Sequence, residues 1–338
     1  MTRPPLMSDF MLPNSDQTPM DRLSRRTALG AGLSVAAGAA LGARAVAAAA
    51  PAKGKYDLMD PETNLKALLK LQGDLAEKDV ISGFGGEAWA WVSGKGNTKV
   101  FKTFGIGASR LQAMGEGTYR FLHKEVLYYC DPKTGEILDT WTNPITNKKI
   151  EVLHILNDPV NRLYKLKGGL IDPPFPHEVV GDRVVFQLDV LRSTEKNPLT
   201  RAEYPLQSQQ DLYQSGEMWA ISGSLKELSD PKVTSAENHT AWARVGMWLP
   251  FMEMGDLPGV MIYHSQSFKY KQGKSQIPAK ILAYTEKHYP QYLEAPKEWK
   301  EQRENENTWT YSKKIIEQRK AAGKMKPDGS VFGVPDKA

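Results

Sequence analysis

Hydrophobic and polar positions alternate along the middle of the chain. Between about residues 83 and 271, short runs rich in Val, Ile, Tyr, Phe and Trp are separated by Gly, Pro, Asn and Asp. A period of two is typical of strands with one face toward a core. The strands predicted in this way are 87–93, 98–105, 118–130, 136–142, 149–157, 183–193, 216–223, 239–248 and 260–269. Their number and spacing favour a mainly β fold, a single antiparallel β-barrel or sandwich with a lipocalin-like barrel as one form.

Helical spacing of apolar residues flanks this region on both sides. Residues 61–78 predict an amphipathic helix that Asp60 caps and Pro61 begins, with Gly73 as a stop signal. Residues 278–294 and 307–322 predict helices after the strands. Between the strands, Asp131-Pro132-Lys133-Thr134-Gly135 predicts a hairpin turn, because Pro presets φ and Gly accepts a positive φ.

The N-terminal segment predicts export. Arg25 and Arg26 follow Ser24 and precede a run of Ala, Gly, Leu and Val that ends in A-x-A-like sites before Ala50. This pattern is typical of a twin-arginine signal, which a receptor reads and which leaves no stable membrane anchor after cleavage. We therefore expect the twin-arginine machinery as a partner and a periplasmic location. The predicted organisation is a leader over 1–50, a β-rich domain over 51–295, and a basic helical extension with a loose tail over 296–338.

Composition narrows the classes of function. The formal net charge of the whole chain is +5, a mild excess that does not predict nucleic-acid binding. Cys130 is the single cysteine, so no intramolecular disulfide can form, which suits a chain that folds in the cytoplasm before export. Cys130 lies in an apolar strand, where a buried structural residue is expected.

Polar residues are densest between residues 141 and 164. On strand spacing, His154 shares a face with apolar residues. It is either an acid–base group oriented by Asp158 or Asn157 and supported by Tyr129, or a buried histidine ahead of an Asn-Asp-Pro turn. Trp141, Asn143, Asn157 and Asn161 are the candidate ligand contacts in this segment.

Three blocks in this region together resemble a known family. They are Tyr129-x-Asp131-x-x-Thr134-Gly135-Glu136-x-Leu138, then Trp141-x-Asn143-Pro144-x-Thr146, then His154-x-x-Asn157-Asp158-Pro159-Val160-Asn161. In this order they are similar to the bacterial domain of unknown function 1838, over about residues 60–294. The resemblance implies an exported protein with a single domain and no agreed activity. It assigns no site residues.

A second polar and aromatic group falls on later strands. It comprises Glu217, Trp219, His239, Trp242 and His264. These side chains either line a pocket for an apolar or aromatic molecule or fill the interior of a barrel.

No motif for a metal or an organic cofactor accompanies these groups. The six histidines show neither HxH nor HExxH spacing, and the glycines at 83–86 and 105–107 lack the strand–GxGxxG–helix context. The cofactor is therefore unknown. Three hypotheses remain: a binder of an apolar or aromatic small molecule inside the barrel, a cofactor-independent enzyme that uses His154, and a structural or partner-binding protein with a filled core.

Overall fold

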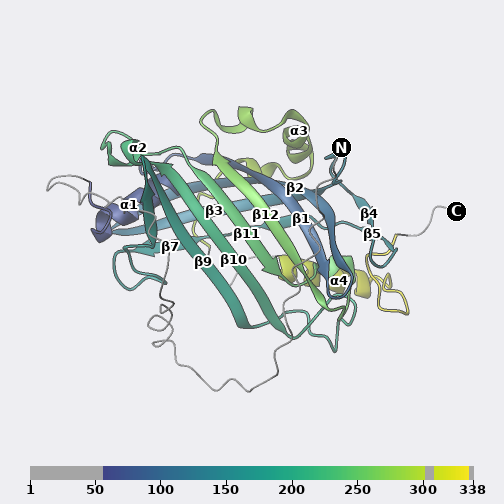
Figure 1. The fold of residues 1–338 in the computed structure, drawn as a ribbon. Helices are drawn as coiled ribbons and strands as arrows, with labels where there is room; N and C mark the ends of the chain where they lie inside the picture. The colour runs from purple at the N-terminus through teal and green to yellow at the C-terminus, as the bar shows by residue number, and fades with distance from the viewer. Residues whose placement is uncertain (1–55, 301–307, 335–338) are drawn as a thin grey trace, which may run out of the picture. The chain divides into compact units, whose positions relative to one another are not determined.

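One large antiparallel sheet dominates the protein. The computed structural model describes residues 56–300 and 308–334. Ten strands are hydrogen-bonded in the order β6-β3-β2-β1-β12-β11-β10-β9-β8, with β7 also paired to β3 (Figure 1). Their bounds are β1 Val80–Val92, β2 Gly96–Gly115, β3 Thr118–Cys130, β6 Ile155–Asn157, β7 Arg162–Lys165, β8 His177–Val180, β9 Arg183–Lys196, β10 Leu212–Ser224, β11 His239–Gly246 and β12 Gly259–Lys269. The prediction of a mainly β fold is confirmed, and the sheet is not closed: β8 lies at one margin, β6 and β7 at the other.

Short elements complete the described chain. Strands β4 (Thr140–Thr142) and β5 (Lys149–Glu151) form a separate two-stranded sheet. The helices are α1 Pro61–Gln72, α2 Leu225–Ser229, α3 Ala279–His288 and α4 Thr308–Ala321, with 3-10 turns η1 Pro250–Met252, η2 Gly273–Gln276 and η3 Pro290–Leu293. The predicted strands 136–142 and 149–157 are thus reduced to β4, β5 and β6. The predicted twin-arginine signal lies outside the described residues.

Helix α1 begins at the start signal and ends at the stop signal in the sequence. The Asp60 carboxylate accepts a hydrogen bond from the Thr63 backbone N–H at 2.8 Å, and Pro61 occupies the first helical position. Gly73 is the C-cap, so the helix is shorter than the predicted 61–78. Its apolar face is fully buried through Leu65, Leu68 and Leu69.

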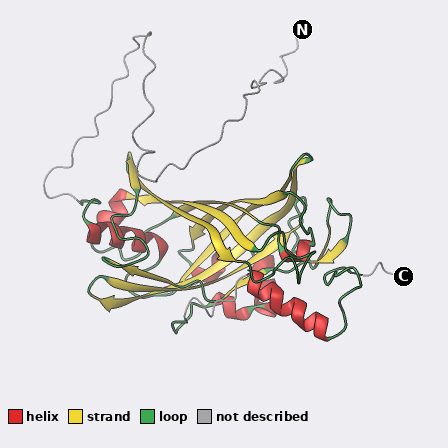
Figure 2. Ribbon diagram, turned by 90° about the horizontal axis from the view of Figure 1, so that it is seen from below, coloured by secondary structure: helices red, strands yellow, loops and turns green. Residues whose placement is uncertain are grey.

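The two faces of the large sheet are covered differently. We call the face that carries Phe101, Leu127 and Tyr129 the inner face, and the opposite face the outer face. Helix α1 packs at one end of the inner face, while α4 and residues 247–254 pack at the other (Figures 1 and 2). On the outer face, α3 and η3 cover parts of β1, β2 and β3. The middle of the inner face lies between these two covered ends and is not packed against a helix of the described chain.

Glycines on β2 make room for side chains on the inner face. A Cβ at Gly105 would lie 2.2 Å from the Phe84 ring, and one at Gly107 would lie 2.7 Å from the His123 imidazole. Such contacts are far inside van der Waals distance. These glycines therefore leave room for neighbouring side chains within the sheet.

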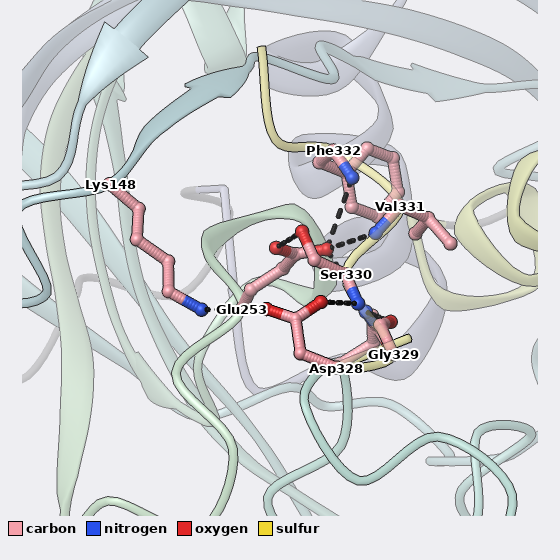
Figure 3. Close-up of polar contacts among 8 residues, drawn as sticks. Lys148, Glu253, Asp328, Gly329, Ser330, Val331 and Phe332 are labelled. Carbon is pink, nitrogen blue, oxygen red and sulfur yellow. Dashed lines mark hydrogen bonds and ion pairs between the residues drawn. The ribbon is translucent and has the colours of Figure 1, made fainter. Parts of the chain in front are cut away.

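A buried carboxylate holds the C-terminal segment against the core. Glu253 is 3% exposed and accepts hydrogen bonds from the backbone N–H groups of Val331 (2.7 Å) and Phe332 (3.1 Å) and from the Ser330 hydroxyl (Figure 3). Gln207 Nε2 donates a further bond at 3.0 Å. We expected a basic helical extension with a loose tail over 296–338. Helix α4 lies in this segment, but Val331 and Phe332 of the tail belong to the same buried cluster as the sheet. The reason is a tertiary contact that has no local sequence signal.

Candidate functional site

Charged side chains occupy the middle of the inner face. Glu125 and Arg162 come from the β3–β7 side, and Glu217 and Arg244 come from β10 and β11. The side chains of Glu125 and Glu217 remain 25% and 26% exposed, and that of His123 15% exposed. Solvent therefore reaches this part of the inner face. We call the following group the inner-face site: His123, Glu125, Tyr129, Arg162, Glu217, Trp219, Trp242, Arg244 and Tyr263.

Glu125 organises one side of the inner-face site. Its Oε1 accepts a hydrogen bond from Asn157 Nδ2 at 2.8 Å, and its Oε2 lies 3.5 Å from His123 Nε2. Burial acts to raise the pKa of Glu125, but His123, Asn157 and Arg162 outweigh it and hold that pKa below its usual value. Asn161 Oδ1 accepts from the His123 backbone N–H at 3.0 Å and fixes the strand beside it. The carboxylate is therefore ionised and oriented.

Arg244 organises the other side. Its Nη2 donates to the Tyr213 hydroxyl at 2.7 Å, and its Nε lies 3.7 Å from Glu217 Oε1. Trp242 Nε1 donates to Glu217 Oε2 at 3.3 Å. Burial acts to lower the pKa of Arg244, but Tyr213, Glu217 and Tyr263 outweigh it and raise that pKa well above its usual value. A charged guanidinium is thus kept inside the protein by its partners.

Aromatic rings connect the two sides. The Arg162 guanidinium lies 5.6 Å from the Trp219 ring centroid, within the range of a cation–π contact. Trp219 and Trp242 have centroids 5.7 Å apart, and Trp242 and Tyr263 5.9 Å apart. Since β7 and β10 are not paired in the sheet, the Arg162–Trp219 contact shows that the sheet curls until its two sides meet across the inner face.

Two tyrosine hydroxyls meet at the base of the inner-face site. Tyr129 and Tyr263 are both fully buried, and their hydroxyl oxygens lie 3.0 Å apart. Burial raises the pKa of Tyr129 well above its usual value and that of Tyr263 to about 12. Both phenols are therefore neutral near pH 7 and can donate or accept one hydrogen bond.

Buried polar atoms without a hydrogen-bond partner gather on the inner face. Among the described residues that show this feature, six have inner-face positions or contact them: Thr103 Oγ1, His123 Nδ1, Asn157 Oδ1, Ser215 Oγ, Arg244 Nε and Ser265 Oγ. Buried polar groups are bonded in the great majority of cases, so such a cluster is unusual. These atoms are available to hydrogen-bond a water or a ligand.

The structure brings six of the predicted residues to or beside this site. Tyr129, Glu217, Trp219 and Trp242 belong to it, and Asn157 and Asn161 hold His123 and Glu125 in place. The remaining predicted residues lie elsewhere.

His154 and Asp158 are not part of the inner-face site. His154 is 6% exposed and packs edge-on against Tyr128 at 5.2 Å, and Tyr284 of α3 lies 6.2 Å from it. Its Nδ1 accepts a hydrogen bond from the Tyr129 backbone N–H at 3.3 Å. Burial lowers the pKa of His154 to about 4. Asp158 is 3.3 Å from Lys300 Nζ. The acid–base role of His154 stays a prediction, and its surroundings favour the packing role.

Four further residues predicted as ligand contacts lie outside the inner-face site, among other parts of the fold. His239 is on the outer face, where it bonds Gln266 and stacks on Phe268 at 5.0 Å. His264 is exposed on the same face. Trp141 packs on Phe101 at 4.7 Å. Asn143 is fully buried and uses its side chain to close a turn, accepting from the Ile145 N–H at 2.9 Å and donating to the Met252 carbonyl at 3.2 Å.

Sequence reasoning missed His123, Glu125, Arg162, Arg244 and Tyr263. Alternation along 118–130 places His123 and Glu125 on the face of Tyr129, so this signal was present. Arg244 likewise follows Trp242 by two positions on one strand. For Arg162 the chain offers no local signal, because its partner Trp219 comes from a distant strand.

The described residues were also compared with the requirements of a metal site and of a membrane-spanning helix. Over residues 56–300 and 308–334, His, Cys, Asp and Glu side chains form no group of three or more that could hold a metal ion. Within the same residues, no helix has the length and apolar character needed to cross a membrane.

Comparison with known proteins gives a family and no activity. No curated protein matches the chain. The model of one family, described as a protein of unknown function (DUF1838), matches residues 77–316, which include every strand of the large sheet and the whole inner-face site. This match covers well over half of the chain. The protein therefore belongs to the DUF1838 family.

Proposed function

We propose that the inner-face site binds a small molecule that combines a flat apolar face with polar groups. The observation that carries the proposal is the partial exposure of charged side chains on an inner face that the fold otherwise buries. A filled structural core would place aliphatic side chains there instead. Trp219 and Trp242 offer ring faces, while Glu125, Arg162 and Arg244 offer fixed hydrogen-bonding groups. In this proposal the curled sheet acts as an incomplete barrel around its ligand.

Loss of the Trp219 ring is expected to weaken binding. In Trp219→Ala, the affinity for a ligand that co-purifies with the wild-type protein should fall by about tenfold or more, because the stacking face is removed. Native mass spectrometry identifies the ligand, and calorimetry measures its affinity. Trp91→Ala is the matched control, since Trp91 is 55% exposed on the outer face. Equal affinities of both variants, or wild-type protein that carries and binds no small molecule, would contradict the proposal.

We further propose that the protein acts in the periplasm after twin-arginine export, an inference that rests on Arg25 and Arg26. Fractionation of cells that express the full chain should find the shortened protein in the periplasm. Arg25→Lys combined with Arg26→Lys should leave the unprocessed chain in the cytoplasm. Unchanged export of this double variant would exclude the twin-arginine route.

A further inference from the structure

Strand β9 leaves a long free edge on the sheet. It pairs with β10 along most of its length, but β8 pairs only with residues Arg183–Phe186. The Gln187 N–H bonds the Pro176 carbonyl, and beyond it no described residue pairs with the far side of β9 as far as Lys196. Figure 1 shows β9 at the margin of the sheet. An unpaired strand edge presents backbone donors and acceptors that another strand can complete.

A row of apolar side chains on the outer face ends at this same edge. From β9 across β10, β11, β12 and β1, the residues that lie directly opposite one another are Leu191, Gly216, Val245, Ile262 and Trp89. Leu191 is 77% exposed and Val245 36% exposed. Helix α3 and η3 cover a different part of the outer face. The free backbone edge and the exposed apolar row thus meet at Leu191.

We propose that β9 is a homodimer interface, in which a second copy of the chain adds its β9 antiparallel to the first, centred on Leu191. A two-fold axis perpendicular to the sheet keeps the outer faces of both copies on one side. Each outer-face residue of one β9 must therefore lie opposite an outer-face residue of the other. The two apolar rows then join through Leu191 and its counterpart. The ten-stranded sheet becomes continuous across the dimer.

The charges of β9 and its apolar outer-face row together favour this register. With Leu191 opposite itself, Val190 faces Arg192 and Asp189 faces Ser193, so no like charges are opposed. A shift that places Arg192 opposite itself opposes two guanidinium groups. A shift in the other direction, centred on Val190, places the Asp189 carboxylate against Leu191. This edge can therefore pair with the same edge of another copy without opposing like charges and with the two Leu191 side chains in contact.

Cysteine cross-linking tests the register directly. Cys130, the single natural cysteine, is 2% exposed, and burial raises the pKa of its thiol to about 11, so a new surface cysteine is the only reactive one. In Leu191→Cys the two new thiols lie opposite each other at a separation that permits a disulfide. Mild oxidation should convert most of this variant to a covalent dimer. Met218→Cys, on the outer face of β10 and 43% exposed, is the matched control and should stay uncrosslinked.

Sedimentation of protein purified from cells that express the full chain completes the test. The wild type should sediment as a dimer, and Leu191→Asp should raise the dimer dissociation constant by about tenfold or more, because two carboxylates then face each other. Circular dichroism should show the variant folded, since Leu191 is exposed. A monomeric wild type, a dimer that Leu191→Asp leaves intact, or equal cross-linking of both cysteine variants would each overturn the proposal.

Discussion

Replacing Arg244 with methionine is expected to lower the free energy of unfolding by about 3 kcal/mol, as for other broken buried ion pairs. Arg244 is 7% exposed, bonds the Tyr213 hydroxyl and lies close to Glu217. Methionine preserves much of the volume of the side chain, so the loss reports mainly the missing charge and hydrogen bond. Glu217 would remain on the inner face with Trp242 as its described hydrogen-bond donor.

Urea denaturation of wild type and variants measures this effect. Arg201→Met is the matched control, because the Arg201 side chain is 48% exposed, lies outside β9 and pairs with the exposed Asp256. Adding Glu217→Gln to Arg244→Met should recover part of the lost stability, since the unpaired carboxylate is then neutral. If Arg244→Met and Arg201→Met unfold at the same urea concentration, the buried ion pair does not stabilise the fold as described.

Acidification is expected to destabilise the protein through His154. The pKa of this histidine falls from 6.5 to about 4 in the folded protein, first because of burial and further because of His288, with Asp139 opposing. Between these two values the unfolded chain binds a proton that the folded chain does not. Stability is therefore complete above about pH 6.5 and is lost as pH falls toward 4. This difference in pKa corresponds to about 3 kcal/mol.

The variant His154→Gln isolates this contribution. Its amide oxygen can still accept the Tyr129 N–H, but it has no proton to gain between pH 7 and pH 4. The free energy of unfolding of the wild type should therefore fall more steeply over this interval than that of His154→Gln. His264→Gln is the control, because His264 is exposed on the outer face. Parallel pH profiles for all three proteins would show that His154 is not buried in the neutral form.

The strands and turns were accessible from the sequence because they depend on near neighbours. The Asp131–Gly135 turn forms as predicted: the Asp131 carboxylate accepts from the N–H groups of Lys133 and Thr134, and Gly135 has φ of 75°. Alternation also places Glu217 and Trp219, which are two residues apart on one strand, on the same face. It did not predict that the partners of Glu217 are Arg244 and Trp242, because the register between β10 and β11 sets that pairing.

Alternation along each strand also explains why some predicted site residues lie on opposite faces of the sheet. His239 and Trp242 are three positions apart on β11, so their side chains point to opposite faces. In the sheet Trp242 joins the inner-face site, and His239 lies outside with Phe268. Likewise, Tyr129 and Tyr128 are neighbours in the chain, yet one lines the inner face and the other packs against α3.

The sequence by itself determined the mainly β class, most of the long strands, the cap of α1 and a buried Cys130, since each follows from propensities and spacings within a few residues. Only the tertiary structure decided where the site is. Arg162 reaches Trp219, and Glu253 holds residues 330–332, through contacts between segments far apart in the chain. Such contacts depend on strand order, register and the curl of the whole sheet, and a slip of one residue in any strand would turn its side chains to the other face.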